Sequence, residues 1–201
     1  MTLIISKVES MGFEFSRKKL MVNKILICHT GTVCNAVQTV HVKFDSLPQG
    51  DLHISYELTG DLAKIRIPAP LPPAAVDGLW ERTCFEVFVA VEGEAGYHEF
   101  NFSPSGQWAA YAFSDYRVLS AWTVNQAPIV SFVQDSGHLL LQAVIAADDL
   151  PQNIADKSLQ LGLSAVIEAN DGSRSYWALH HPVVHPDFHH RAGFILSLNP
   201  A

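Results

Sequence analysis

The chain has 201 residues, of which 48% are hydrophobic and 16% are charged, and its formal net charge is −7. This composition excludes an intrinsically disordered protein and indicates one compact domain. An acidic chain lacks the basic surface that nucleic-acid binding requires, and no apolar run approaches the roughly 20 residues of a membrane-spanning helix.

The first 23 residues differ in charge from the chain that follows. Residues 1–24 carry five basic and two acidic side chains, a net charge of +3, so the remaining 177 residues carry −10. We predict a loosely attached extension over 1–23, or a start of translation at Met21, and a single domain over 24–201. The apolar stretch over 3–5 is too short for an export signal, so a cytoplasmic location is the default expectation.

Apolar and polar side chains alternate with a period of two along most of the predicted domain, which is typical of β-strands with one buried face. Gly, Pro, Asp, Asn or Ser bound the segments, and hairpin turns are predicted at 135–137 and 170–172. Only 115–119 and 148–154 have short helical patterns. About ten or eleven strands at this spacing predict an all-β fold, an antiparallel β-sandwich of the jelly-roll or immunoglobulin-like type. The candidate segments for these strands are 24–28, 39–44, 53–59, 63–67, 83–91, 97–103, 107–113, 129–135, 138–146, 159–168, 174–179 and 193–198.

The chain has three cysteines, Cys28, Cys34 and Cys84. An odd and sparse count is not a disulfide framework, so reduced thiols are expected, with a bridge between Cys28 and Cys34 left open as the alternative. No Cys-x-x-Cys pair occurs in the sequence, which excludes a structural zinc site of the usual spacing.

The predicted strands 83–91 and 97–103 form a hairpin whose register follows from their apolar residues. Pairing Val91 with Gly96 leaves a four-residue loop and collects an almost wholly apolar set on one face, whereas a slip of one residue would mix the two faces. The apolar face carries Phe85, Val87 and Val89 beside Phe102, Phe100 and His98. The opposite face carries Cys84, Glu86, Phe88 and Ala90 beside Ser103, Asn101, Glu99 and Tyr97.

The next turn extends this second face onto a third strand. A four-residue loop over 103–106 places the indole of Trp108 beside Asn101. The small side chain of Ala110 then lies beside Glu99 and leaves room above the sheet. Aromatic rings beside carboxylate and amide groups suit a sugar, because rings cover its C–H faces and the polar groups bind its hydroxyls.

Two other interpretations of this polar face remain open. It can form an internal hydrogen-bond network that links Glu86 or Glu99 to Arg82 or Arg117, since buried polar groups are normally satisfied. It can also be the ordinary solvent-facing side of a sheet.

Five of the ten histidines lie between residues 180 and 190. The spacing of four between His181, His185 and His189 would place them along one face of a helix and suggest a metal site. Pro182 and Pro186 break any such helix, so we predict a rigid loop between two strands. This loop either lies on the surface or closes over the polar face, and a metal or haem site is the third alternative.

Motifs for catalysis are scarce in the chain. It contains no nucleophile elbow, no Gly-rich phosphate loop and no metal dyad of recognisable spacing, so we do not expect an enzyme. Glu86 and Glu99 share one face on adjacent strands, diagonally and roughly 7–8 Å apart at their Cβ atoms. Carboxyl separations of that order occur in glycosidases, which keeps a glycosidase as a minor alternative.

Three stretches of the chain resemble the DOMON-like superfamily, and within it the branch related to family 9 carbohydrate-binding modules. They are LWERTCFEVFV over 79–89, GYHEFNFSPSGQWAAYAFSDYR over 96–117, and YWALHHP with PDFHHRAGFIL between 176 and 196. One subgroup of that branch occurs beside, or fused to, a cell-wall precursor reductase. The resemblance covers 24–199 and implies a non-catalytic β-sandwich that binds a sugar or, in other branches, haem.

Haem is not expected here. Haem-binding relatives tend to use a methionine together with a histidine or lysine. The three methionines, Met1, Met11 and Met21, all precede the predicted domain. Haem would therefore need two histidine ligands, and we predict no cofactor.

The sequence thus predicts a carbohydrate-binding-like or accessory module, with a structural or protein-interaction domain as the alternative. The expected partner is a sugar or amino-sugar ligand, or a partner protein, and neither nucleic acid nor a membrane. Residues on and around the polar face, together with the tryptophans that the resemblance suggests as ring plates, are the candidates for ligand binding. They are Trp80, Arg82, Glu86, Tyr97, Glu99, Asn101, Trp108, Arg117, Trp177 and His189.

Overall fold

The computed structural model describes residues 22–32, 34–46, 50–152 and 157–199. Residues 1–21 of the predicted extension, with the alternative start at Met21, therefore lie outside the described residues. The first strand begins at Val22, within the last part of the predicted extension. Val22 pairs with Phe44, so the last two residues of the predicted extension belong to a sheet.

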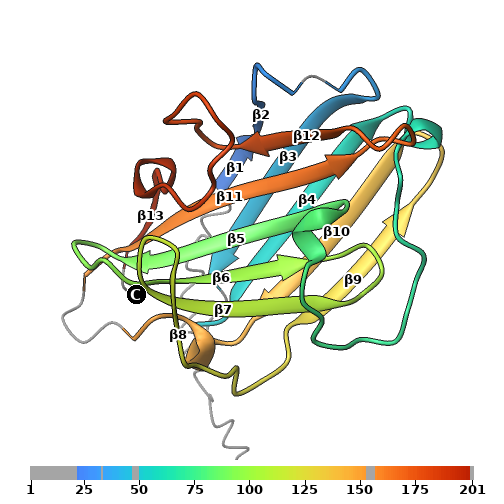
Figure 1. Cartoon of the computed structure of the whole chain (residues 1–201). Helices are drawn as coiled ribbons and strands as arrows, with labels where there is room; N and C mark the ends of the chain where they lie inside the picture. The colour runs from blue at the N-terminus through green and yellow to red at the C-terminus, as the bar shows by residue number, and fades with distance from the viewer. Residues whose placement is uncertain (1–21, 33, 47–49, 153–156, 200–201) are drawn as a thin grey trace, which may run out of the picture.

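The structure is an all-β sandwich of two antiparallel sheets, as predicted (Figure 1). The smaller sheet has the order β1-β3-β4-β10-β9 and lies behind the larger sheet in this view. Its strands are β1 (Val22–Ile25), β3 (Val37–Ser46), β4 (Leu52–Gly60), β10 (His138–Ile145) and β9 (Ile129–Gln134).

The larger sheet has the order β2-β12-β11-β5-β6-β7-β8, and β13 also pairs with β11. Its strands are β2 (Ile27–Cys28), β12 (Arg174–Ala178), β11 (Leu159–Glu168), β5 (Cys84–Val91), β6 (Tyr97–Phe102), β7 (Trp108–Asp115), β8 (Val118–Ser120) and β13 (Leu196–Leu198). Four 3₁₀ turns complete the described part: η1 (Leu62–Lys64), η2 (Leu79–Glu81), η3 (Ala147–Asp149) and η4 (Arg191–Gly193). No helix among the described residues is long and apolar enough to cross a membrane.

Three local predictions were wrong. The predicted strand 63–67 is the turn η1 followed by one isolated bridge from Ile65, because the chain only crosses between the sheets there. The predicted helical piece 115–119 is a tight turn that leads into β8, with Arg117 at a φ of 55°. The predicted strand 24–28 divides at Leu26 into β1 and β2, which belong to different sheets.

Several other local predictions are confirmed. The turn at 135–137 is closed by a hydrogen bond from the Asp135 amide to the His138 carbonyl, and the turn at 170–172 by one from Gly172 to Ala169. The short helical piece predicted near 148–154 corresponds to η3, and its last two residues fall outside the described part. All three cysteines are free thiols, as expected.

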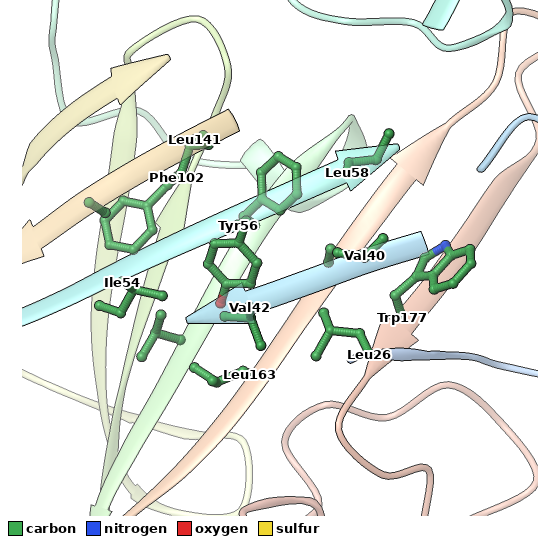
Figure 2. Close-up of a cluster of buried hydrophobic side chains, with 14 of the residues drawn as sticks. Leu26, Val40, Val42, Ile54, Tyr56, Leu58, Phe102, Leu141, Leu163 and Trp177 are labelled. Atoms are coloured by element: carbon green, nitrogen blue, oxygen red, sulfur yellow. The ribbon is translucent and has the colours of Figure 1, made fainter. Parts of the chain in front are cut away.

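The main hydrophobic core fills the space between the two sheets (Figure 2). The alternation of β4 points Ile54, Tyr56 and Leu58 inward, and all three side chains are fully buried. Leu163 and Trp177 enter the same core from the larger sheet. Burial on this scale stabilises the sandwich, at roughly 25 cal/mol for each Å² of apolar surface removed from water.

The hydroxyl of Tyr56 connects the two sheets through the middle of this core. It donates a 2.6 Å hydrogen bond to the backbone carbonyl of Glu86. We expect Tyr56→Phe to lower the free energy of unfolding by about 1–2 kcal/mol, because the Glu86 carbonyl then lacks this buried donor. Urea denaturation measures the change, and Tyr176→Phe is the control because that half-buried hydroxyl makes no hydrogen bond among the described residues. An equal loss in both variants would contradict the prediction.

The predicted hairpin between β5 and β6 is confirmed, with Val89 opposite His98 and Glu86 opposite Asn101. The predicted register of the next hairpin is wrong by one residue, since Asn101 lies opposite Ala109 and not opposite Trp108. The Ser103 amide donates to the Gln107 carbonyl, so the loop holds three residues and ends at Gly106 with a φ of 88°. A left-handed glycine is common at that place in a three-residue hairpin loop.

The one-residue shift exchanges the two faces of β7. Trp108 points into the core between the sheets, and Tyr111 takes the place beside Glu99 that was predicted for Ala110. Phe113 lies beside Tyr97, and the two rings stack with their centroids 4.7 Å apart.

Candidate functional site

The outer face of the larger sheet is covered, although a sandwich normally exposes such a face to water. Glu86 is only 2% exposed and Glu99 only 5%, which excludes the solvent-facing interpretation of the polar face. Two small apolar clusters lie on either side of these carboxyls. One contains Phe88, Ala90, Tyr97, Phe113 and Phe194, and the other contains Leu79, Cys84 and Ala109.

A cavity of about 360 Å³ opens above the carboxyls. This volume lies in the range of small-molecule pockets, roughly 300–1,000 Å³. Six aromatic side chains line it: Trp80, Phe88, Tyr111, Phe113, Tyr176 and Phe188. The polar lining residues are Glu86, Glu99, Arg117, Arg174 and His189. Leu119, Val166 and Pro186 complete the lining.

Glu86 lies on β5 at the base of this cavity. Its Oε2 accepts a 3.1 Å hydrogen bond from the Ser164 hydroxyl, and its other carboxylate oxygen has no hydrogen bond from the described residues. Burial and then the charge of nearby Glu99 raise the pKa of Glu86 to about 8, against the lowering effect of the Ser164 hydrogen bond. At neutral pH this side chain is mainly protonated in the empty cavity.

Glu99 lies diagonally from Glu86, on β6. Asn101 Nδ2 donates a 2.8 Å hydrogen bond to Glu99 Oε1, while the buried Asn101 Oδ1 atom has no hydrogen-bond partner among the described residues. Burial raises the pKa of Glu99 to about 7, although the Asn101 hydrogen bond and the charge of Arg117 both lower it. The two carboxyls therefore hold protons near neutral pH because the fold keeps them out of water.

The histidine-rich loop between β12 and β13 closes one side of the cavity, as one of the predicted alternatives proposed. His189 Nδ1 lies 2.8 Å from the Tyr97 hydroxyl, and its Nε2 lies 3.7 Å from Glu99 Oε2. Burial, together with the positive charge of Arg117, lowers the pKa of His189 to about 4, so the ring is neutral at physiological pH. Tyr97 lies under the loop and positions this ring.

Arg117 and Asp187 hold the same loop in place. Arg117 Nη2 forms a 3.0 Å ion pair with Asp187 Oδ1, and the Tyr116 hydroxyl donates to Asp187 Oδ2 at 2.8 Å. The backbone amide of His189 also donates to Asp187. Since Arg117 is committed to Asp187, it forms no ion pair with either buried glutamate among the described residues.

Arg82 does not reach the polar face, which corrects one version of the predicted internal network. Its Nη1 lies 2.9 Å from Glu168 Oε1, and Arg66 Nη1 lies 2.9 Å from the same oxygen. The ion pair of Arg82 fastens the loop before β5 to Glu168, the last residue of β11. The network that would have tied Glu86 or Glu99 to Arg82 or Arg117 therefore lacks both cations.

The predicted tryptophans separate into two groups. Trp80 is 42% exposed and lines the cavity, where its ring meets the ring of Tyr111 edge-on at 5.8 Å. Trp108 and Trp177 are core residues, and the indole of Trp177 donates to Ser175. Trp108 also borders a separate, shallower hollow together with Trp122.

Most of the aromatic rings that line the cavity were not among the residues predicted to bind a ligand. Tyr111 was missed because of the register error, and the αL-compatible Gly106 in the preceding loop was the signal that pointed to the correct register. Tyr176 and Phe188 come from β12 and its following loop, where no local pattern distinguishes cavity-lining rings from core rings. No group of three or more potential metal ligands occurs among the described residues.

No protein-family model and no curated protein matches the chain. Among solved structures, a "putative carbohydrate-binding protein" from Bacteroides uniformis matches with a TM-score of 0.57 and 17% sequence identity, over 87% of this chain and 84% of that chain. A family 9 carbohydrate-binding module from Caldicellulosiruptor kristjanssonii, in complex with cellotriose, matches with a TM-score of 0.46 and 11% identity, over 79% of this chain and 72% of that chain. The first likeness shows the fold: the chain is a β-sandwich of the same kind as the Bacteroides protein.

Proposed function

We propose that this protein is a non-catalytic binding module that holds a small sugar-class ligand in the cavity on the outer face of the larger sheet. The observation that carries the proposal is the lining itself, six aromatic rings around two buried carboxyls. Rings cover the C–H faces of a sugar, and carboxyl groups bind its hydroxyls. The name of the Bacteroides uniformis protein that shares the fold agrees with this assignment.

The unfinished hydrogen bonding of the cavity also supports a ligand. One oxygen of Glu86, a residue that lines the cavity, accepts no hydrogen bond from the described residues. Buried polar groups are nearly always satisfied, so a ligand with hydroxyl or amine donors would complete the hydrogen bonding of Glu86. A purely internal hydrogen-bond network would need no ligand, but its own side chains would then supply a hydrogen-bond partner for every buried polar atom.

Titration with sugars tests this proposal. We expect at least one monosaccharide or disaccharide from a panel of neutral and amino sugars to bind with a Kd between roughly 1 mM and 1 μM, as measured by saturation-transfer NMR and calorimetry. Trp80→Ala should weaken that binding about tenfold or more, because the exposed ring forms a wall of the cavity. Ile129→Ala is the control, since Ile129 is also an exposed hydrophobic residue but lies on β9 in the other sheet.

Two results would contradict the proposal. One is a panel in which no sugar binds the wild-type protein, which would leave the structural or protein-interaction alternative. The other is binding that Trp80→Ala and Ile129→Ala affect equally, which would place the sugar outside this cavity.

A further inference from the structure

The cavity contains two acidic groups that the protein does not neutralise directly. Glu86 and Glu99 lie on neighbouring strands and face the same space. Among the described residues, no lysine or arginine lies within ion-pair distance of either carboxyl, and the nearby imidazole of His189 is 3.7 Å from Glu99 Oε2. Two buried acids without a cation are costly unless they stay protonated or receive a cation from outside.

The aromatic rings around these acids supply the second feature of a cation site. Phe88 comes from β5, the strand of Glu86, while Tyr111 and Phe113 come from β7, the strand next to that of Glu99. Trp80 and Phe188 also line the cavity. The faces of aromatic rings attract a cation, and this attraction is stronger where water is excluded. A positive group in this cavity would meet ring faces and carboxylate oxygens together.

From this arrangement we infer that the ligand carries a protonated amine, which binds between Glu86 and Glu99 inside the aromatic walls. The unpartnered oxygen of Glu86, on a side chain that is 2% exposed, is one acceptor for its N–H groups. Glu99 Oε2 is the second acceptor. The inference rests on the proposed sugar-binding function and narrows its ligand to an amino sugar with a free amine.

Binding of such an amine is coupled to proton release. Without a ligand, the carboxyl groups of Glu86 and Glu99 hold protons near neutral pH. An ammonium group between them favours their ionised forms. Affinity for the amine therefore rises with pH as Glu99 and then Glu86 lose their protons, up to the pH at which the amine loses its own proton. A sugar without an amine has no such dependence.

The other groups that face the carboxyls do not titrate in this range. The pKa values of Tyr56, Cys84, Tyr97 and Tyr111 are all raised by burial, so these groups stay neutral. The pKa of His189 lies at about 4, so its ring also stays neutral above pH 5. The pKa of Asp187 is lowered by hydrogen bonds from Tyr116 and Arg117, and Arg117 and Arg174 are the basic residues in the lining.

Calorimetric titration of the full chain with three related sugars tests the inference. At pH 7.5, glucosamine should bind about tenfold or more tightly than N-acetylglucosamine and glucose, because only its amine is charged. At pH 5.5 both carboxyls are protonated, so this preference should disappear. Glu86→Gln and Glu99→Gln should remove it at pH 7.5, whereas the control Glu57→Gln, on β4 of the other sheet, should retain it.

The outcomes separate this inference from the proposed function. Glucosamine binding no more tightly than N-acetylglucosamine at pH 7.5 would overturn the amine and leave the sugar-binding function standing. A preference that persists in both glutamine variants would also overturn it, since the amine would then bind elsewhere. Failure of all three sugars to bind the wild-type protein would overturn this inference, whereas the proposed sugar-binding function is overturned only when no sugar of the wider panel binds.

Discussion

Trp108→Ala should lower the free energy of unfolding by about 3–5 kcal/mol, the usual cost of deleting a large aromatic side chain from a packed core. Trp108 is 8% exposed and belongs to the core between the sheets. The backbone of Trp108 also forms hydrogen bonds with the backbone of Ala74 and Val76. Collapse of the core around the missing ring would therefore disturb the segment that contains these two residues. Urea denaturation of the wild-type and variant chains measures the loss.

Trp80→Ala is the matched control for this substitution. It removes the same side chain from a partly exposed position, so the expected stability change is below about 1 kcal/mol. The two variants should therefore affect different properties: Trp108→Ala lowers the free energy of unfolding, and Trp80→Ala weakens ligand binding. A Trp108→Ala protein of nearly wild-type stability would show that the ring lies on the outer face, as the sequence had suggested.

The first hairpin could be predicted in detail because its two faces differ in polarity. Phe85, Val87 and Val89 alternate with residues that include a glutamate, so only one register buries the apolar set. The sandwich followed from the same alternation, repeated along the chain. Local pattern therefore predicted the base of the cavity, with Glu86 and Glu99 on one face.

The second hairpin could not be predicted from polarity, because β7 has alanine and aromatic residues on both faces. Trp108 and Ala110 face the core, while Ala109, Tyr111 and Phe113 face outward. A shift of one residue exchanges two sets that are almost equally apolar. The turn decides between them through its left-handed glycine, and turn chemistry is a weaker signal than a change of polarity.

The contacts that segments distant in the sequence make at and around the cavity were predicted least well, for a physical reason. Arg82 pairs with Glu168, and Phe188 meets the cavity from a loop about 100 residues beyond Glu86. Such contacts depend on how the strands are ordered in the sheet, which periodicity alone does not give. The histidine-rich loop was predicted only in part: its two prolines indicated a rigid segment, but the position that brings His189 over the carboxyls was one of three open alternatives.

Glu86→Gln should stabilise the protein at alkaline pH, in contrast to most substitutions of buried residues. The pKa of Glu86 is about 8 in the folded protein and lies near the ordinary value of 4.5 when the chain is unfolded. Between these values the folded protein binds more protons than the unfolded chain, so the free energy of unfolding falls as the pH rises. Glutamine keeps the shape and the Ser164 hydrogen bond, but it has no charge to bury.

The expected gain at pH 8.5 is about 2–4 kcal/mol over the wild type, with little difference at pH 4.5, where the carboxyl is protonated in the folded protein and half protonated in the unfolded chain. Thermal and urea unfolding at the two pH values measure it, without added sugar. Glu57→Gln is the control because hydrogen bonding to His138 lowers the pKa of Glu57, so removal of that charge should not stabilise the protein at pH 8.5. A Glu86→Gln variant that is less stable than the wild type at pH 8.5 would mean that the folded protein stabilises the ionised carboxylate. The protein would then supply its own counter-charge, and the cavity would have no need of a cationic ligand.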